Sequence, residues 1–405
     1  MKKADPKAIQ KALLECPNKK VREALECAIK DDKLDAHLAR IGVTREKLTY
    51  STNPTIRKSP RYKTLKDFKT VRHNTPVISF FSGAGGLDLG LESAGFSHLA
   101  VVEKNRLCCD TIKANRPWTV IGPPNHPGDV SETKQLVSAL NKLTLGRPFE
   151  GLFVGGPPCQ PFSIAANQRF SKGSTEFKRT GFNNEKNGNL LFDYISLILE
   201  FKPKAFLIEN VPGLRDVDGG KQIKKAYAIL SKAGYNVNEP LVLESSEYSV
   251  PQRRTRLFII GSRTSKKFIP PEKCAEKIPT WSAISAGLKG LENHEVRNHS
   301  ATSIARYQAL GIGQRDQLGR VDRLDPNLPS KTVIAGGTGG GGRSHLHPFT
   351  PRTLSVRECA RLQTFPDDYK FIGPSARQFT QVGNAVPPVL GAQLGRAIYQ
   401  SFFKE

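Results

Sequence analysis

GLFVGGPPCQPFS, residues 151–163, joins a short apolar run to an abrupt break in regular backbone structure. The run from Leu152 to Val154 is typical of a buried strand. The two prolines at 157 and 158 end it, because each removes a backbone donor and fixes φ. Cys159 follows at once, so we expect it on a stiff loop at the edge of an open α/β sheet where ligands bind. Taken alone, the pattern fits equally a cysteine buried as a small core hydrophobe beside a turn.

Strand and helix patterns alternate on both sides of this stretch. Apolar runs predict strands at residues 77–81, 99–103, 204–210 and 256–261. Helical spacing predicts helices at 87–94, 105–115, 131–143, 190–201 and 221–232, and again at 355–365 and 388–402. This alternation predicts an α/β fold, with a parallel-type, doubly wound sheet that carries helices on both faces.

Changes in composition divide the chain into four segments. Residues 1–73 are predicted to form a basic helical extension followed by a proline-broken linker or DNA-tracking arm at 50–72. Residues 74–261 form the first part of the α/β domain, and residues 353–405 return to it. Between them, residues 262–352 lose the strand–helix rhythm and contain four of the eight histidines and the glycine-rich run 336–343. We expect this segment to be a small irregular domain.

The charge of the chain is strongly positive and unevenly distributed. The net charge is +24, of which residues 1–75 carry +10 (19 Lys+Arg against 9 Asp+Glu) and residues 262–352 carry +7 (14 against 7). Such asymmetry predicts a polyanionic partner, and nucleic acid is favoured over a membrane surface because the sequence has no amphipathic helix with bulky aromatic residues. No secretion signal or membrane-spanning run is evident, and seven cysteines without a CxxC pair predict reduced thiols in the cytoplasm. The histidines of 262–352 lack cysteine partners and regular spacing, so we expect no metal site.

A glycine-rich turn, SGAGG, follows the first predicted strand and opens a helix. Gly83, Gly85 and Gly86 let the backbone approach a ligand closely and offer N–H groups at a helix N-terminus. Asp88 stands where a dinucleotide fingerprint needs its third glycine, and no P-loop lysine follows. Glu103 ends the second strand, where a carboxylate accepts bonds from ribose hydroxyls, and Asp129 is placed to meet an adenine amino group. Singly, either carboxylate also fits a solvated loop charge or a helix cap; together with the glycines they predict a nucleoside pocket such as S-adenosylmethionine requires.

Two further groups lie at predicted strand ends. Glu209 ends an apolar strand, so its carboxyl group has a raised tendency to hold a proton. In QRRTR, residues 252–256, Arg254 and Arg256 share one face of a strand. Two arginines that lead into a buried strand indicate an anionic partner, although a solvated basic strand start is the simpler explanation.

The chain resembles the cytosine-C5 DNA methyltransferase family of bacterial restriction–modification type. Six motifs occur in the family's order: FSGAGG, GGPPCQPFS, ENV, QRRTR, RECARLQTFPDDY and GNAVPP. They cover residues 76–262 and 353–401. The resemblance implies an S-adenosylmethionine-dependent, Rossmann-like catalytic domain, with residues 262–352 as the target-recognition domain. It also assigns the helix at 355–365 the structural task of packing these two parts together.

The resemblance also implies a mechanism and a set of site residues. Cys159 adds to C6 of an extruded cytosine, Glu209 holds or donates a proton at N3, and Arg256, with Arg254 beside it, holds the base carbonyl or a flanking phosphate. The loop at 167–189 is expected to act as a lid, and residues 336–343 to enter the major groove. The expected cofactor-binding residues are Phe80, Ser82, Gly83, Ala84, Gly85, Gly86, Leu87, Glu103, Asp129, Val130, Pro158, Asn384 and Val386.

The expected partners are double-stranded DNA and, in the same system, a cognate restriction endonuclease without a physical complex; the enzyme is expected to be a monomer. Two alternatives stay open at this point. One is an RNA cytosine-C5 methyltransferase that shares the cysteine chemistry. The other is a DNA-binding regulator that reads its site through residues 1–73, as a second role.

Overall fold

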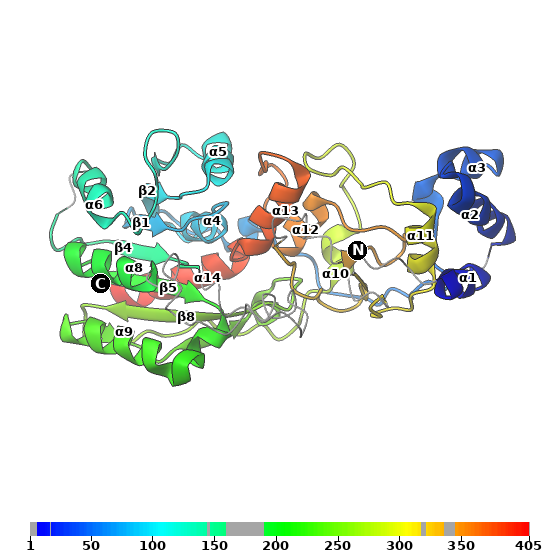
Figure 1. Cartoon of the computed structure of the whole chain (residues 1–405). Helices are drawn as coiled ribbons and strands as arrows, with labels where there is room; N and C mark the ends of the chain where they lie inside the picture. Colours follow the sequence, from blue (N-terminus) through cyan, green and yellow to red (C-terminus); the bar gives the residue numbers. More distant parts are fainter. Residues whose placement is uncertain are drawn as a thin grey trace.

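The structure is a computed structural model that describes residues 6–16, 18–143, 146–158, 190–316, 321–335 and 345–404. Its two halves lie side by side, an α/β domain and a smaller irregular one, with the N-terminal helices at the far end of the smaller half (Figure 1). No helix in the described ranges is both long and apolar enough to cross a lipid bilayer.

The sheet of the α/β domain has the order β3-β2-β1-β4-β5-β8-β6, and β7 also pairs with β8. Strands β1 to β5 are parallel. The order reverses between β1 and β4, which is the switch point where ligands bind in doubly wound sheets. The bounds are β1 Pro76–Phe80, β2 Ser97–Val102, β3 Val120–Ile121, β4 Leu152–Gly155, β5 Ala205–Asn210, β6 Asn236–Val237, β7 Leu241–Glu244 and β8 Thr255–Ser262.

Strand β8 runs antiparallel to β5, which departs from the parallel sheet that the alternation predicts. Asn210, the last residue of β5, pairs with Leu257 near the beginning of β8. The chain passes from β7 to β8 without a crossover helix, so the two strands pair antiparallel, and β6 is also antiparallel to β8. The antiparallel direction places the start of β8, with its arginines, at the same edge as the carboxyl end of β5.

Helices cover both faces of the sheet, as the sequence predicts. On one face α6, α8 and α9 share a core with alternate residues of the strands, such as Ile78 and Phe80 of β1. On the other face α4 and α14 pack on the intervening residues, such as Val77. This alternation is the two-residue period of a strand buried on both sides. The helices are α4 Gly86–Ser93, α5 Arg106–Asn115, α6 Thr133–Asn141, α8 Leu190–Phe201, α9 Lys221–Lys232 and α14 Pro388–Ile398, which ends in the turn η7 Tyr399–Phe403.

The smaller half contains little regular structure, as expected for residues 262–352. Its elements are α10 Thr280–Ile284, α11 Ala301–Gln308 and the short parallel pair β9 Asp322–Arg323 and β10 His345–Leu346. Its core continues into α12 Val356–Leu362 and α13 Ser375–Asn384, because Ile284 and Val333 pack in one cluster with residues of both helices. The segment that follows residue 352 therefore belongs, in packing terms, to both halves.

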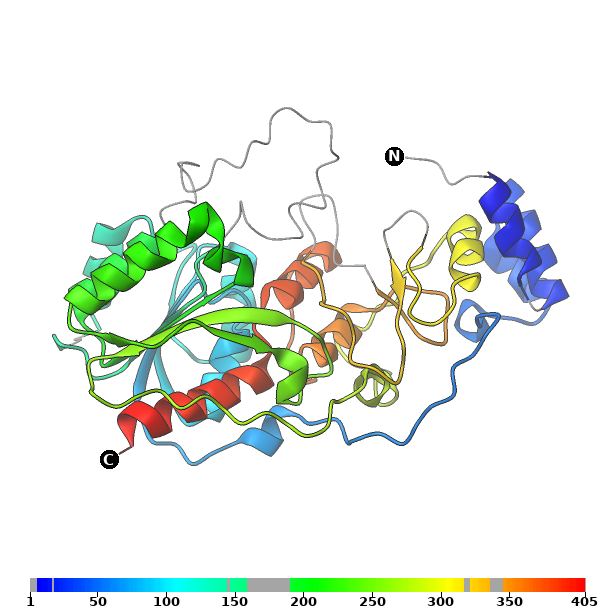
Figure 2. The same cartoon turned by 90° about the horizontal axis from the view of Figure 1, so that it is seen from below.

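The N-terminal extension forms helices α1 Pro6–Leu14, α2 Lys19–Asp31 and α3 Leu34–Arg40, as predicted. Leu25 of α2 is fully buried in one cluster with Ile304 and Ala305 of α11. After the short turn η1 Arg45–Lys47, the chain runs extended along the molecule to β1, interrupted only by η2 Leu65–Phe68 (Figure 2). Tyr50 donates to the His347 carbonyl at 3.0 Å and Tyr62 to the Arg361 carbonyl at 2.9 Å, so the predicted linker is fastened to the smaller half.

Candidate active site

Two glycines at the end of β4 allow its backbone to lie unusually close to α8 and β5. A Cβ on Gly155 would lie 2.8 Å from the Tyr194 ring, and one on Gly156 would lie 2.9 Å from Oε2 of Glu209. The Asn210 side chain donates to the Pro157 carbonyl at 3.1 Å. The backbone that leads into Cys159 is therefore held beside Glu209. Cys159 itself, like the predicted lid at 167–189, lies outside the described residues.

Glu209 is paired with Arg256. The Arg256 Nε lies 3.0 Å from Oε1 of Glu209, and the two side chains are 17% and 15% exposed. Burial raises the pKa of Glu209 above its ordinary value, although Arg256 and then Arg254 act to lower it. Burial likewise lowers the pKa of Arg256, against the attraction of Glu209. Glu209 can hold a proton, and Arg256 beside it is a hydrogen-bond donor, so both groups are available at the ligand-binding edge of the sheet.

Arg254 is more deeply placed than Arg256. It is 1% exposed, and its two terminal nitrogens donate to the carbonyls of Val333 at 3.5 Å and Asn384 at 3.3 Å. Its Nε has no hydrogen-bond partner among the described residues. Burial lowers the pKa of Arg254 well below its ordinary value, and the neighbouring Arg256 acts in the same direction. The guanidinium joins β8 to the smaller half and to the GNAVPP motif.

The glycine-rich turn lies beside Glu103. Gly83 has φ +54° with open space where a side chain would project, and its N–H donates to Glu103 Oε2 at 2.7 Å. The Asn105 N–H donates to Oε1 at 2.6 Å. Burial raises the pKa of Glu103, while these backbone donors lower it. Phe81, at the head of the turn, is the non-glycine residue there with positive φ, at 55°.

The GNAVPP motif returns to this turn. A Cβ on Gly86 would lie 2.4 Å from the Val386 carbonyl oxygen, so the two segments touch backbone to backbone. Asn384 ends α13 and is exposed, while Val386 is buried. The structure thus brings the predicted residues of the first and last motifs together.

The other predicted cofactor residues have more varied surroundings. Phe80 is 1% exposed and packs against Phe153 and Tyr194, so its side chain lies in the core below the turn. Asp129 forms an ion pair with Lys104 and accepts from the Ser131 hydroxyl at 2.8 Å.

Of the remaining predicted residues, Ala84, Leu87 and Val130 are buried and Pro158 is exposed. The Ser82 hydroxyl donates to that of Ser79 at 3.0 Å.

These residues fit S-adenosylmethionine. Each Glu103 oxygen accepts one backbone N–H, and a carboxylate oxygen has a second lone pair that a ribose hydroxyl can use. A Cβ built on Gly83 would meet nothing within 4 Å, so there is open space beside the glycine that binds this carboxylate. Glu103, the glycine turn and Asp129 would hold the nucleoside.

The sequence did not indicate which distant side chains pack against the glycine-rich turn at residues 82–86. The Tyr369 hydroxyl donates to the Ala84 carbonyl at 2.8 Å and lies 3.1 Å from a Cβ built on Gly85. His98 stacks on Trp118 with ring centroids 4.2 Å apart and contacts Asp88 at 3.1 Å. Tyr369 belongs to the quoted RECARLQTFPDDY motif, but nothing in its spacing indicates that it reaches residues almost three hundred positions earlier.

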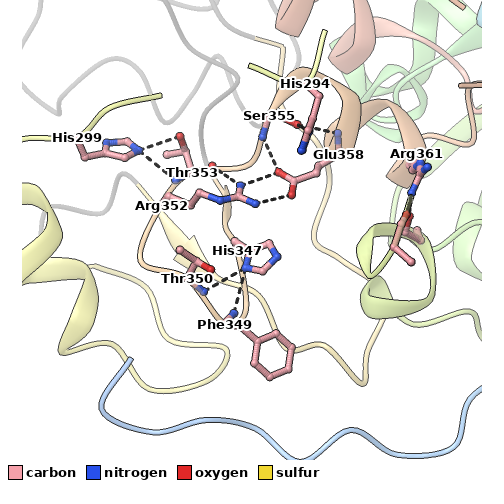
Figure 3. Close-up of polar contacts among 12 residues, drawn as sticks. His294, His299, His347, Phe349, Thr350, Arg352, Thr353, Ser355, Glu358 and Arg361 are labelled. Carbon is pink, nitrogen blue, oxygen red and sulfur yellow. Dashed lines mark hydrogen bonds and ion pairs between the residues drawn. The ribbon is translucent and has the colours of Figure 1, made fainter. Parts of the chain in front are cut away.

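A polar network ties helix α12 to the smaller half (Figure 3). Arg352 makes a two-pronged ion pair with Glu358, at 2.8 and 2.7 Å, and Glu358 also accepts from the Ser355 N–H at 2.7 Å. Arg361 binds Asp367 and donates to the Gly287 carbonyl at 2.9 Å. His299 and His294 bond to Thr353 and Ser355 (Figure 3). These contacts agree with a structural task for this helix.

Comparisons with known proteins agree with the site. The model of the C-5 cytosine-specific DNA methylase family matches residues 75–400. The chain is 34% identical over 355 residues to the type II methyltransferase M.PspPI of Psychrobacter sp., covering 80% of this chain and 78% of that protein. It is 32% identical over 357 residues to M.MthTI of Methanothermobacter thermautotrophicus, covering 80% and 97%.

Among solved structures, a prophage-encoded methyltransferase of E. coli superposes with a TM-score of 0.66 at 24% identity, covering 82% of this chain and all of that one. The methyltransferase EhMeth of Entamoeba histolytica gives 0.61 at 18% identity, with the same coverage. At these identities the likeness supports the fold. Because the family model spans most of the chain and describes a DNA methylase, it favours DNA over RNA as the substrate. The chain belongs to the C-5 cytosine-specific DNA methylase family, and it transfers a methyl group from S-adenosylmethionine to C5 of cytosine in DNA.

Proposed function

We propose that Cys159 is the nucleophile and that Glu209 and Arg256 act on the base that it attacks. The observation that carries this is the contact of Glu209 with Gly156, three residues before Cys159. A thiolate that adds to C6 of cytosine pushes electrons into the ring, and a proton at N3 neutralises them. C5 then behaves as an enamine carbon. When bound, S-adenosylmethionine supplies an electrophilic methyl group. Loss of the C5 proton to a base, departure of the Cys159 thiolate from C6 and return of the N3 proton to Glu209 restore the neutral aromatic ring.

Glu209 suits the proton role because of its surroundings. Burial raises the pKa of its carboxyl group, so a proton remains on it to a higher pH than on an exposed glutamate. Arg256 at 3.0 Å fixes the carboxyl group and brings a second donor, which would bind the base carbonyl. The two side chains would thus bind adjacent positions, N3 and the C2 carbonyl, on one edge of the ring.

The predicted cofactor residues are proposed to bind through the glycine turn and Glu103, with Asp129 on the adenine side. The packing of Val386 on Gly86 supports a pocket in which the GNAVPP motif would form one wall. C5 and C6 are stacked within a duplex, so the target base is extruded before it reaches the pocket.

We infer that the biological setting is restriction and modification. The relatives named above are type II methyltransferases. The chain would methylate one specific double-stranded sequence, as a cytoplasmic monomer, and protect it from a cognate endonuclease. The basic residues 262–352 and their glycine-rich run at 336–343 would contact the DNA. That run lies outside the described residues.

The packing of the N-terminal helices bears on the regulatory alternative. Leu25 of α2 is buried against Ile304 and Ala305 of α11, so α1 to α3 share their core with the smaller half. A freely moving reading head would keep its own core. This observation favours a role for residues 1–48 as part of the target-recognition half.

Bisulfite sequencing of DNA from cells that express the protein tests the proposal. Wild-type protein should protect one cytosine in a fixed sequence, and Cys159→Ala should protect none while still binding S-adenosylmethionine. Cys27→Ala is the matched control, since Cys27 is exposed on α2, and it should behave as wild type. Methylation by the Cys159 variant would exclude that residue as the nucleophile.

A further inference from the structure

Two buried glutamines from separate motifs meet in this structure. Gln252 is the first residue of QRRTR and Gln363 directly follows α12, and both side chains are 0% exposed. The Gln252 Nε2 donates to Gln363 Oε1 at 2.9 Å and makes a longer contact of 3.4 Å with the Leu362 carbonyl. Neither side chain has a part in the mechanism described above.

Backbone groups at each end fix the orientation of both amides. The Val333 N–H donates at 2.8 Å to Oε1 of Gln252, so that atom must be the oxygen. The Gln363 Nε2 donates to the Val382 carbonyl at 2.7 Å and the Ala385 carbonyl at 3.3 Å, so its other atom is the acceptor. The result is one directed chain of hydrogen bonds from the Val333 peptide through two amides to the GNAVPP motif. Such chains are stiff because each bond polarises the next.

Two of these backbone segments, at Val333 and in the GNAVPP motif, also bind Arg254. Its guanidinium donates to the Val333 carbonyl at 3.5 Å and the Asn384 carbonyl at 3.3 Å. The Val333 peptide is therefore bound at its N–H by Gln252 and at its carbonyl by Arg254. Adjacent backbone bonds extend this contact, because the Arg253 N–H donates to the Ser330 carbonyl at 2.8 Å.

Gly383 allows the GNAVPP motif to contact the backbone of residues 334 and 335 directly. A Cβ on Gly383 would lie 2.4 Å from the Ala335 nitrogen, closer than any side chain permits. The backbone at 330–335 therefore lies between the start of β8 and the GNAVPP motif. We call Gln252, Arg254, Val333, Gln363 and Gly383 the junction.

We propose that Gln252 and Gln363 are positioning residues for catalysis, because the junction sets where β8 begins and therefore where Arg256 meets Glu209. Arg256 is the second residue of β8 and lies only two residues beyond Arg254, so a shift in the junction is passed along this short segment to the Arg256–Glu209 contact. A backbone segment from the target-recognition half is thereby part of the catalytic framework. This inference rests on the proposed roles of Glu209 and Arg256.

The test compares Gln252→Met with Gln381→Met in the full-length enzyme. Gln381, on α13, is 5% exposed and makes the same kinds of bond: its oxygen accepts from the Thr111 hydroxyl at 2.7 Å, and its nitrogen donates to the Ile372 carbonyl at 2.8 Å. Both variants should lower the melting temperature. Only Gln252→Met should lower the single-turnover rate of methyl transfer, by about tenfold to a hundredfold, because small misplacements of reacting groups have effects of that size.

Two further readouts separate positioning from loss of stability. The dissociation constant for S-adenosylmethionine, measured by calorimetry, should change by a smaller factor than the single-turnover rate in Gln252→Met, since the junction contacts the proposed pocket only at the GNAVPP backbone and leaves Gly83 and Glu103 outside it. The Gln252→Glu variant should regain methyl-transfer rate at acidic pH. A protonated carboxyl group accepts from Val333 and donates to Gln363, whereas the ionised form has no donor. The bonding partners of Gln252 (Val333, Leu362 and Gln363) are uncharged. The ratio of its rate to that of wild type should therefore rise as the pH falls.

Equal rates for Gln252→Met and Gln381→Met, or a Gln252→Glu ratio that does not vary with pH, would overturn the inference. Its failure is distinguishable from failure of the proposed function. If Glu209→Gln still slows the reaction while Gln252→Met does not, only the positioning role is lost. If Glu209→Gln has no effect, the proposed function itself is wrong.

Discussion

Replacing Glu209 with glutamine is the most direct test of the active site. The substitution keeps the size of the side chain and removes both the negative charge and the exchangeable acid proton. Arg256 then lacks the carboxylate that lies 3.0 Å from its Nε. The change therefore acts on catalysis through the proton and on stability through the ion pair, and the two effects can be measured separately.

The substitution should have a large effect on the reaction rate and a smaller effect on the free energy of unfolding. Loss of one acid–base group lowers the rate by a factor on the order of 10²–10⁴, equivalent to about 3–5 kcal/mol of transition-state stabilisation. Loss of a charged hydrogen-bond partner from a side chain only 15% exposed costs about 1–3 kcal/mol of folding free energy. That energetic loss is small enough for the variant to remain folded at assay temperature.

The assay is single-turnover transfer of a tritiated methyl group to cognate duplex DNA, corrected for the folded fraction from thermal denaturation. Glu92→Gln is the matched control. Glu92 pairs with Arg116 at 2.8 Å, and these two side chains are 26% and 25% exposed, similar to the Glu209 pair. The control removes an equivalent ion pair at the end of α4, away from the strand ends. It should lose stability and keep its rate.

A rate for Glu209→Gln within threefold of the control would refute the proton role. The pH dependence provides an independent check. Since burial raises the pKa of Glu209, the folded protein retains a proton that the unfolded chain loses near the ordinary value of 4.5. Stability contributed by this group is present below that value and falls as the pH rises through the raised pKa. Glu209→Gln should remove this part of the pH dependence of the melting temperature.

Three further outcomes follow from the same contacts. Arg256→Met removes a partner that lowers the pKa of Glu209, so the pH at which the rate falls on the alkaline side should move upward in a pH–rate profile, and an unchanged profile would contradict the pairing. Leu25→Ala, at a fully buried position between α2 and α11, should lower the unfolding free energy by about 2–5 kcal/mol in denaturant titrations; a change below 0.5 kcal/mol would mean that the N-terminal helices do not pack as described. For Glu358, burial raises the pKa, but Arg352, His347 and the Ser355 N–H together outweigh burial and lower it. Its stabilising contribution should be complete above pH 4.5 and disappear as the pH falls through the lowered pKa, and Glu358→Gln should flatten the melting temperature over that acid range.

Much of the α/β domain was predictable from local patterns. Apolar runs located β1, β2, β4, β5 and β8, and helical spacing located the helices between them. The glycines at 83, 85 and 86 predicted a turn of unusual backbone, and two of them have positive φ. These predictions succeed because element type and burial follow from residues within one or two turns of each other in sequence.

The candidate site was predictable as a set of residues, not as an arrangement. The motifs named Glu209, Arg254 and Arg256, but a parallel β8 would have placed the arginines at the opposite edge of the sheet. Only the antiparallel pairing of Asn210 with Leu257 brings them beside Glu209. Phe80 is another example: as the last residue of β1 its side chain points into the core, while Phe81 stands at the head of the turn.

By itself, the sequence determined the chemistry and the local elements, because both depend on residue types at short spacings. The tertiary structure decided the direction of β8, the packing of α2 on α11, and the meeting of Gln252 with Gln363, which lie 111 positions apart. Each of these depends on which distant segment supplies the partner surface. Apolar periodicity shows that a face is buried, but many faces in one chain have the same period, and only the folded arrangement selects among them.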